Sequence, residues 1–217
     1  MSRSLRHRWR RFRAWLSPSR TVELGRVIPS GSSVLDVGCG SRSQLVNLRE
    51  RLSRLSGIDA FPAALEDAHR SGAFDSLVEG RVQELDRLFD ADAYDVVAAI
   101  DLLEHLDEDD GGRLLKAMER VAAGRVVVLT PNRFVPQDAR DGNPFQVHRS
   151  GWSPAQLRAR GFSVKGMHGL RMLRSEEARI RFRPHRFWAL VSDFTAPIAR
   201  VVPSLAYHLI ATKDVGR

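Results

Sequence analysis

The sequence predicts an α/β fold with a doubly wound, mostly parallel sheet, and two observations support this prediction. Strand-like apolar runs alternate with helix-like segments along the chain, which is the order that produces a parallel sheet with helices on both faces. The segment 94–100 is apolar almost throughout, as is typical of a strand that is buried on both faces. A chain of 217 residues, of which 43% are hydrophobic, is large enough to form one such domain.

The elements are placed by the signals at their boundaries. The first strand begins at Val34 and runs into a glycine turn, after which apolar residues return at helical spacing. Pro62 opens a later helix, and Ser153 with Pro154 forms the N-cap and the first position of another. We expect further strands at 55–58, 77–79, 94–100, 125–129, 162–173 and 207–212, and helices at 44–55, 62–70, 109–121 and 155–160.

The glycine turn is the strongest functional signal in the chain. Residues 34–40 read Val-Leu-Asp-Val-Gly-Cys-Gly, and two glycines at this spacing let the backbone bend sharply and approach a ligand closely. Asp59 follows Gly40 by nineteen residues, where a βαβ unit places the carboxylate that binds ribose hydroxyls. A dinucleotide turn would need glycine where the chain has Ser43, and Asp36 would repel a pyrophosphate. The turn therefore favours a nucleoside cofactor that carries positive charge.

This segment resembles motif I of the class I S-adenosylmethionine-dependent methyltransferases, whose usual form is V-L-D-x-G-C-G-x-G. The chain is most similar to the small bacterial domains of the type-11 and type-23 group, although Arg42 stands where the family usually has its third glycine. The resemblance covers roughly residues 30–213. It implies a Rossmann-like, seven-stranded, mostly parallel sheet with its last strand antiparallel, S-adenosylmethionine as the cofactor, and methyl transfer that we expect to be O-methylation.

The resemblance also assigns the cofactor-binding residues. The segment 80–86 corresponds to the family's adenine loop, in which Val82 supplies a backbone donor and Gln83 an edge contact. The strand 94–100 ends in a segment that resembles the family's D-x-L-E-H-L, where the backbone of Ile100 and Asp101 accepts from the methionine ammonium. The expected cofactor-binding residues are Asp36, Gly38, Cys39, Gly40, Asp59, Val82, Gln83, Ile100 and Asp101.

A long polar loop at residues 133–150 is the expected acceptor site, because loops of this length in a compact domain are usually functional. Its continuation to residue 152 resembles a subgroup of small bacterial methyltransferases, some of which modify surface polysaccharides or lipids. The expected acceptor-binding residues offer hydrogen-bonding groups, a cation and an aromatic face, which suit a hydroxylated acceptor. They are Asn143, Gln146, Arg149 and Trp152. The candidate general bases are His148, His105 and Asp138, since imidazole titrates near neutrality.

The net charge of +8 is concentrated at the N-terminus. Residues 1–20 hold seven arginines and no acidic residue, which leaves 27 basic and 26 acidic residues elsewhere. Apolar residues recur at helical spacing between these arginines, namely Leu5, Trp9, Phe12, Trp15 and Leu16. We expect a basic amphipathic arm at 1–28, in front of a methyltransferase domain at 29–217. Anionic lipid, nucleic-acid phosphates and the domain itself all stay open as its partner.

A second basic-amphipathic segment is expected as an insertion at about 174–204. Five basic residues over 179–186 precede an apolar stripe that Pro197 interrupts. The stripe consists of Phe187, Leu190, Val191, Phe194 and Ile198. This segment and the arm are two candidate lid or membrane-facing elements.

Composition excludes several other classes. The single cysteine, Cys39, cannot form a disulfide within the chain and excludes Cys-rich iron–sulfur and zinc sites, and we assign no metal ligands. There is no secretory signal or transmembrane run, so we expect a cytoplasmic protein, for which the inner face of the membrane is a candidate partner of the basic arm.

The expected acceptor is a small molecule, a glycan or a lipid-linked hydroxyl or amine, and two alternatives stay open. One is an RNA methyltransferase that uses the arginine-rich arm, which is not favoured because the rest of the chain is nearly neutral. The other is a non-catalytic binding protein with the same fold, which Arg42 in the glycine turn motivates.

Overall fold

The computed structural model describes residue 8 and residues 12–139, 142–175 and 179–216. The expected arm positions Leu5 and Trp9 lie outside the described residues. The helices are α2 (Arg20–Val27), α3 (Pro62–Arg70), α4 (Leu85–Leu88), α5 (Glu108–Val121), α6 (Pro154–Ala159) and α7 (His185–Val201). Short 3-10 helices are η1 (Gln44–Arg51), η2 (Val82–Glu84), η3 (Leu103–His105), η4 (Pro144–Gln146), η5 (Arg171–Leu173) and η6 (Pro203–Leu205). The strands are β1 (Ser33–Val37), β2 (Arg54–Asp59), β3 (Ser76–Glu79), β4 (Tyr94–Ile100), β5 (Ala122–Pro131), β6 (Ser163–Leu170) and β7 (Ala206–Asp214).

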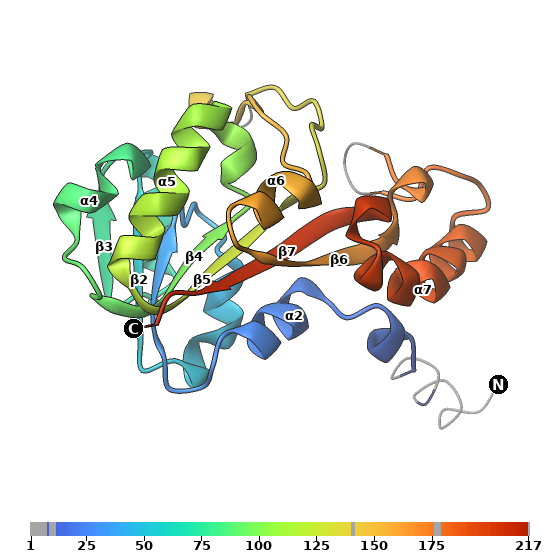
Figure 1. Ribbon diagram of the computed structural model, residues 1–217, viewed down its shortest axis with the longest axis horizontal. Coiled ribbons are helices and arrows are strands. Elements are labelled where there is room, and N and C mark those ends of the chain that lie inside the picture. The colour runs from blue at the N-terminus through green and yellow to red at the C-terminus, as the bar shows by residue number, and fades with distance from the viewer. Residues whose placement is uncertain (1–7, 9–11, 140–141, 176–178, 217) are drawn as a thin grey trace.

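These strands form one sheet in the order β3-β2-β1-β4-β5-β7-β6 (Figure 1). Strands β1 to β5 run parallel to one another, while β7 runs antiparallel to both β5 and β6. The predicted fold class, including the antiparallel last strand, is confirmed. The direction of winding reverses between β1 and β4, and open sheets of this kind bind ligands at the carboxyl ends of the strands beside that point.

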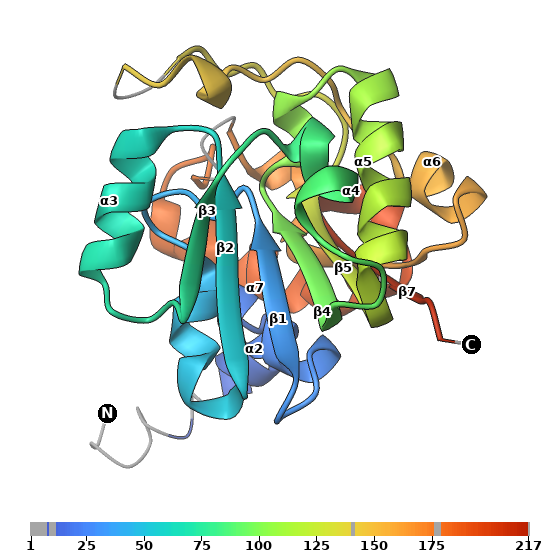
Figure 2. The same cartoon turned by 90° about the vertical axis from the view of Figure 1, so that its left-hand side faces the viewer.

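Helices cover both faces of the sheet (Figures 1 and 2). On one face, α5 and α6 bury Leu114, Met118 and Leu157 against the strands. On the other face, α2 and η1 bury Leu24 and Leu45, and α7 lies on the same side as α2 (Figure 1). Both faces of the central strands are therefore covered, which explains why the β4 segment is apolar almost throughout.

Most expected boundaries agree with the structure, and three differ. The segment 44–55 forms a 3-10 helix that ends at Arg51, because the chain is already extended at Leu52 before it enters β2. The fifth strand is longer than expected and covers Ala122–Pro131. The strand expected at 162–173 ends at Leu170, after a bulge in which His168 and Gly169 have φ of 65° and 67°.

The expected interruption at Pro197 is wrong, since α7 continues through this residue. The helix is held by close packing of small residues against β6, where an added Cβ on Gly166 would lie 2.1 Å from the Ala199 carbonyl oxygen. Packing this close offsets the loss of the helical hydrogen bond that a proline cannot make. The buried residues of α7 are Ser192, Ala196 and Ala199.

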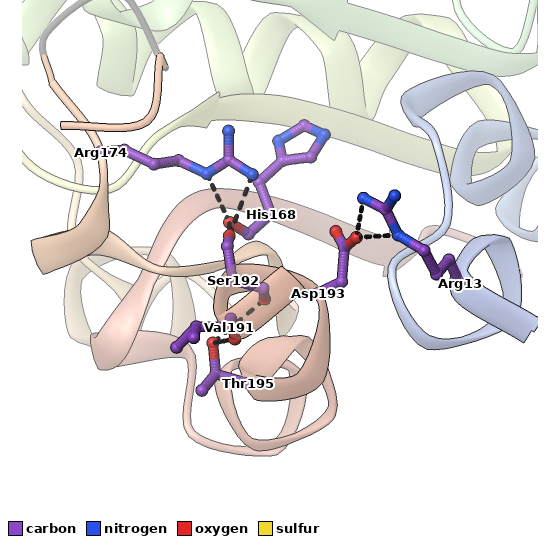
Figure 3. A network of polar contacts seen from close by, with 7 residues as sticks. All are labelled: Arg13, His168, Arg174, Val191, Ser192, Asp193 and Thr195. Carbon is purple, nitrogen blue, oxygen red and sulfur yellow. Dashed lines mark hydrogen bonds and ion pairs between the residues drawn. The ribbon is translucent and has the colours of Figure 1, made fainter. Parts of the chain in front are cut away.

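Polar contacts also attach α7 to its surroundings (Figure 3). Arg174 Nε donates to the His168 carbonyl oxygen at 2.7 Å, and its Nη2 donates to Ser192 Oγ at 3.1 Å. On the other side, Arg13 Nε donates to Asp193 Oδ2 at 2.7 Å. The N-terminal segment therefore lies against α7.

Part of the expected arm packs within the domain. Leu24 and Ile28 are buried in the same core cluster as β1 and β4 residues, so residues 20–28 cover the sheet. Ser19 caps α2 by accepting from the Val22 amide, which places Arg20 at the start of the helix. Among the described residues, none of the helices is both long and apolar enough to cross a membrane.

Candidate active site

Three adjoining cavities lie at the carboxyl edge of the sheet. The large cavity has a volume of about 550 Å³ and the small cavity about 110 Å³. These two share walls formed by Gly38, Gly40, Asp101, His105 and Gln146. A side cavity of about 540 Å³ shares Val135 and Tyr207 with the large cavity. The large and small cavities therefore both border the glycine turn, and the side cavity extends from the large one to η5.

The glycine turn is shaped by conformations that glycine adopts most easily. Gly38 and Gly40 have φ of 70° and 57°. An added Cβ on Gly38 would lie 2.6 Å from Leu102 Cδ1, so the turn packs closely against the end of β4. The Gly40 amide donates to Asp59 Oδ2 at 2.8 Å, which joins the turn to the end of β2. The turn and Asp59 form one preorganised unit.

Asp36 lies buried beneath this turn, in the wall of the large cavity. Burial raises the pKa of Asp36 to about 7, and the hydrogen bond from Ser43 acts in the opposite direction. A buried carboxyl group in this position gains from a nearby positive charge. Cys39 packs against β2, because a Cβ added to Gly57 would lie 2.8 Å from its Sγ. Burial raises the pKa of the Cys39 thiol.

The N-terminal region contributes a charge to the large cavity. Arg20 pairs with the Asp101 carboxylate, and its Nη2 lies 2.7 Å from His208 Nε2. Because a guanidinium only donates, His208 accepts at Nε2 and carries its proton on Nδ1, which lies 2.9 Å from His168 Nδ1. Burial and the Arg20 charge lower the pKa of His208, and they lower that of His168 to about 4. These contacts join α2, β4, β6 and β7 behind the cavity.

His105 and His148 meet in the wall of the large cavity, with ring centroids 4.7 Å apart. His105 Nδ1 lies 3.3 Å from the Val147 carbonyl oxygen, and His148 Nδ1 lies 2.5 Å from that of Val135. Burial and the neighbouring His148 lower the pKa of His105 to about 4, so His105 is neutral near pH 7. The two candidate bases therefore belong to one group.

Glu104 anchors the acceptor loop next to these histidines. Its backbone carbonyl accepts from the amides of Arg149 and Ser150 at 2.7 and 3.1 Å. Its carboxyl group is buried and accepts from Thr130 Oγ1 at 2.9 Å. Burial raises the pKa of Glu104, and the nearby Asp101 charge adds to this effect.

The structure brings the expected cofactor residues together in the walls of two cavities. The large cavity is lined by Asp36, Gly38, Cys39, Gly40, Ile100 and Asp101. The small cavity adds Asp59, Val82 and Gln83. Of the expected acceptor residues, Gln146 lines both cavities and Asn143 lines the small one. Their contacts with a cofactor or an acceptor stay predictions.

Two expected acceptor residues do not line these cavities; the burial of Trp152 contradicts its assignment, whereas the assignment of Arg149 stays a prediction. Trp152 is fully buried, and its Nε1 donates to the Leu103 carbonyl oxygen at 3.3 Å. Its ring packs on α5, where Gly111 leaves room for it, because a large aromatic ring gains most from burial in the core. Arg149 points toward Asp107, with 3.8 Å between Nη1 and Oδ2. Asp138 is exposed and lines neither cavity.

Sequence reasoning missed other residues that line the large cavity, namely Arg20, Glu104, Tyr207 and His208. Arg20 is one of the seven arginines in residues 1–20 and carries no local signal. His208 carries a weak one, since a histidine inside the apolar segment 207–212 needs a polar partner when it is buried.

The residues present fit S-adenosylmethionine. Asp101 Oδ1 is buried and, among the described residues, has no hydrogen-bond partner, which an ammonium group would provide. The space beside Gly40 is open to 4 Å, so the turn offers a cradle that a side chain would fill. Asp59 stands in the wall of the small cavity, where a carboxylate suits ribose hydroxyls. Charge, space and donor set therefore agree with this cofactor.

Comparison with known proteins gives a consistent result. The chain matches a family described as a methyltransferase domain, of type 23, over residues 1–177. It is 29% identical over 109 residues to the mitochondrial ubiquinone biosynthesis O-methyltransferase of Schizosaccharomyces pombe, which covers 48% of this chain and 39% of that protein. It is 30% identical over 127 residues to the ubiquinone biosynthesis O-methyltransferase of Xylella fastidiosa, and this match covers 54% of this chain and 50% of that protein. The matched regions thus span half or less of these relatives.

Among solved structures, the chain is similar to a SAM-dependent methyltransferase from Archaeoglobus fulgidus. The TM-score is 0.58 at 17% sequence identity, and the match covers 95% of this chain and 99% of the other. At this level of identity the similarity concerns the fold.

Proposed function

The chain belongs to the methyltransferase domain family and is an S-adenosylmethionine-dependent methyltransferase. We propose that it methylates a hydroxyl group of an anionic, lipid-linked acceptor. The observation that carries the proposal is the side cavity, which adjoins the large cavity at Val135 and Tyr207. Its walls combine apolar side chains with arginines, as an amphiphile requires. They include Phe134, Met172, Leu205, Arg171, Arg174 and Arg181.

Arginines also favour an acceptor that carries negative charge. Arg20, Arg42 and Arg179 line the large cavity, and guanidinium groups recognise carboxylates and phosphates through paired hydrogen bonds. Arg20 already pairs with Asp101, and Arg42 is the proposed contact for the acceptor. Arg42 therefore replaces the family's usual glycine with a residue that selects the acceptor.

An oxygen acceptor is supported by the relatives and by the site. Both curated relatives are ubiquinone biosynthesis O-methyltransferases. The imidazoles of His105 and His148 lie in the wall of the large cavity, where a neutral ring can take a proton from a hydroxyl group. A hydroxyl gains more from such a group than an amine, whose lone pair is already nucleophilic.

The chain's residues mainly position the two reactants. When bound, S-adenosylmethionine supplies a methyl group that its sulfonium has already activated. Asp36 and Asp101 hold its positive end, Asp59 holds its ribose, and the acceptor loop places the hydroxyl beside the histidines. Such positioning lowers a barrier by roughly 7–11 kcal/mol, and a positioned base adds about 10²–10⁴-fold.

We propose that the lipid-linked acceptor is taken from an anionic membrane surface, to which the protein binds peripherally from the cytoplasmic side. Exposed apolar side chains of α7 lie beside those of the N-terminal helix at residues 12–16, and the Phe12 and Phe194 rings are 6.2 Å apart. We call this the α7 face: Phe12, Trp15, Phe187, Phe194, Ile198 and Val201. Exposed arginines at the start of α7 complement anionic headgroups.

The experiment that tests this function uses the full-length protein with S-adenosylmethionine labelled in its methyl group. The labelled cofactor is incubated with lipid, glycan and RNA fractions of a cell extract. We expect label in the lipid fraction, in a product that carries the methyl group as an ether. Label in RNA that falls steeply with salt would instead support nucleic-acid methylation, and label in soluble glycans would contradict the lipid-linked acceptor.

A further inference from the structure

Three side chains of metal-ligating type meet in the wall of the large cavity. One donor atom from each of Glu104, His105 and His148 lies within 4.8 Å of the other two. Two of these residues follow β4 and the third lies in the acceptor loop. The loop is pinned there because the amides of Arg149 and Ser150 donate to the Glu104 carbonyl oxygen. The cluster is therefore part of the framework that holds the loop in place.

Each imidazole has its Nδ1 next to a backbone carbonyl oxygen. His105 Nδ1 lies 3.3 Å from the Val147 carbonyl oxygen, and His148 Nδ1 lies 2.5 Å from that of Val135. A carbonyl oxygen only accepts, so each ring carries its proton on Nδ1 and has its basic nitrogen at Nε2. Metal-binding histidines are oriented in this way, with the other ring nitrogen donating to a carbonyl or carboxylate.

The carboxyl groups at this place add orientation and negative charge. Glu104 Oε2 accepts from Thr130 Oγ1 at 2.9 Å, which orients the carboxylate. Asp101 supplies a second carboxylate, and Arg20 pairs with it. Burial disfavours the charged form of Glu104, and the nearby Arg20 charge offsets this only in part. A cation bound beside the carboxyl group would favour its charged form further.

We propose that Glu104, His105 and His148 bind one divalent transition-metal ion of the Zn²⁺ or Mn²⁺ kind. Two imidazoles and one carboxylate form a three-ligand set that leaves a position open, which is the arrangement of catalytic zinc sites. Ligands at about 2.0–2.2 Å from such an ion lie roughly 3.3–3.6 Å apart, so the side chains close by about 1 Å on binding. The sequence offered no cysteine-rich spacing to indicate this site, because its ligands come from separate segments.

The site deepens the proposed function and rests on it. An ion at this place changes the histidines from bases into ligands. An acceptor hydroxyl in the open position loses its proton more readily, because the cation stabilises the resulting oxyanion. The proton leaves to solvent, the new O–CH₃ bond forms, and the C–S bond of the sulfonium breaks. The electron pair of that bond stays on sulfur in S-adenosylhomocysteine, so no oxidant or reductant is needed.

The test measures metal binding directly on the full-length protein. The protein is freed of metal with a chelator, dialysed and titrated with Co²⁺, whose visible absorption reports its coordination. We expect one Co²⁺ per chain, with a spectrum of nitrogen and oxygen ligands, and displacement by one equivalent of Zn²⁺. Mg²⁺ is the control cation and is not expected to displace Co²⁺, since it prefers oxygen ligands.

Variants locate the ion. Glu104→Gln, His105→Ala and His148→Ala are each expected to weaken Zn²⁺ binding by at least about tenfold. His69→Ala removes an exposed imidazole on α3 and is expected to bind Zn²⁺ like the wild-type chain. Glu104→Gln keeps the shape of the side chain, and the S-adenosylmethionine affinity of every variant shows whether it is folded.

Failure of the metal site is distinguishable from failure of the proposed function. The site is overturned if the wild-type chain takes up no stoichiometric Co²⁺ or Zn²⁺, or if the three ligand variants bind Zn²⁺ like His69→Ala. Undiminished label transfer by the metal-free chain would contradict the role of the ion while leaving the proposed function intact. Conversely, stoichiometric metal binding without label in the lipid fraction keeps the site and contradicts the proposed acceptor.

Discussion

The two sides of the active site are built in different ways. On the cofactor side, the expected contacts come from the ends of β1 to β4 and from the turns that follow them, so each lies within or a few residues after a strand. On the acceptor side, the walls come from α2, the loop after β5 and β7, and they meet through Arg20, His148 and His208. The cofactor side is a product of local backbone geometry, whereas the acceptor side depends on tertiary packing.

This difference separates the effects that substitutions should have. A change in the turns after β1 and β2 acts on a small set of neighbours and should alter cofactor affinity. A change in the α7–β6 packing or on the α7 face should alter stability or acceptor access and leave cofactor affinity unchanged.

Gly38→Ala is expected to have the largest effect, and it acts on the cofactor side. A non-glycine residue at φ of 70° costs about 1–2 kcal/mol. The new Cβ would lie 2.6 Å from Leu102 Cδ1, which adds about 1–3 kcal/mol of strain. Because Leu102 lines the small cavity, we expect a lower free energy of unfolding and weaker S-adenosylmethionine binding, measured by denaturant unfolding and by calorimetry.

Gly72→Ala is the matched control for this change. Gly72 also has a positive φ, of 65°, but an added Cβ meets nothing within 4 Å. We expect it to lose about 1–2 kcal/mol of stability from backbone strain alone, with unchanged cofactor affinity. If Gly38→Ala binds S-adenosylmethionine as well as Gly72→Ala does, the turn is not the cofactor cradle.

The same contrast explains how much could be predicted from sequence. The places of Gly38, Gly40 and Asp59 in the fold could be predicted because each residue type reports a local requirement: two positive φ values and a carboxylate at the end of a strand. Trp152 was misassigned because nothing local tells a buried ring from one that faces a ligand. Arg20 was missed because its partner Asp101 is distant in the sequence, so only the folded chain brings them together.

Asp59→Ala is the next largest change expected on the cofactor side. Removing a charged hydrogen-bond acceptor for the ribose should weaken S-adenosylmethionine binding by roughly 1.5–3 kcal/mol in calorimetry. The variant also loses the contact from the Gly40 amide at 2.8 Å, so the turn itself loosens. Asp67→Ala removes an exposed carboxylate from α3 of the same βαβ unit and should bind normally. An unchanged affinity in Asp59→Ala would remove the ribose assignment.

Gly166→Ala tests the packing on the acceptor side. The added Cβ would lie 2.1 Å from the Ala199 carbonyl oxygen, and backbone at this position cannot rotate away. We expect α7 to be displaced from β6, with a loss of about 1–3 kcal/mol in the free energy of unfolding. Cofactor affinity, measured on the folded protein, should stay within about twofold, and a large loss would show that the two sides are coupled.

The smallest effect is expected at the α7 face. Arg183→Ala and Arg186→Ala should each weaken binding to anionic vesicles by roughly 1 kcal/mol in flotation assays. Arg87→Ala is the control, because this exposed arginine lies on α4, at the opposite end of the molecule in Figure 1. Equal flotation of all three variants would show that the α7 face does not meet the membrane. A truncation for the same purpose should end before Ser19, because Arg20 pairs with Asp101.

The central claim is that the turns after β1 and β2 bind the cofactor, while His148 serves the acceptor. The most direct test compares His148→Ala with Asp59→Ala, using calorimetry for S-adenosylmethionine affinity and transfer of labelled methyl to the acceptor fraction. We predict that His148→Ala keeps its cofactor affinity within about twofold while transfer falls by about 10²-fold or more, and that Asp59→Ala loses cofactor affinity. A His148→Ala variant that loses as much cofactor affinity as Asp59→Ala, or that transfers methyl at the wild-type rate, would contradict this account.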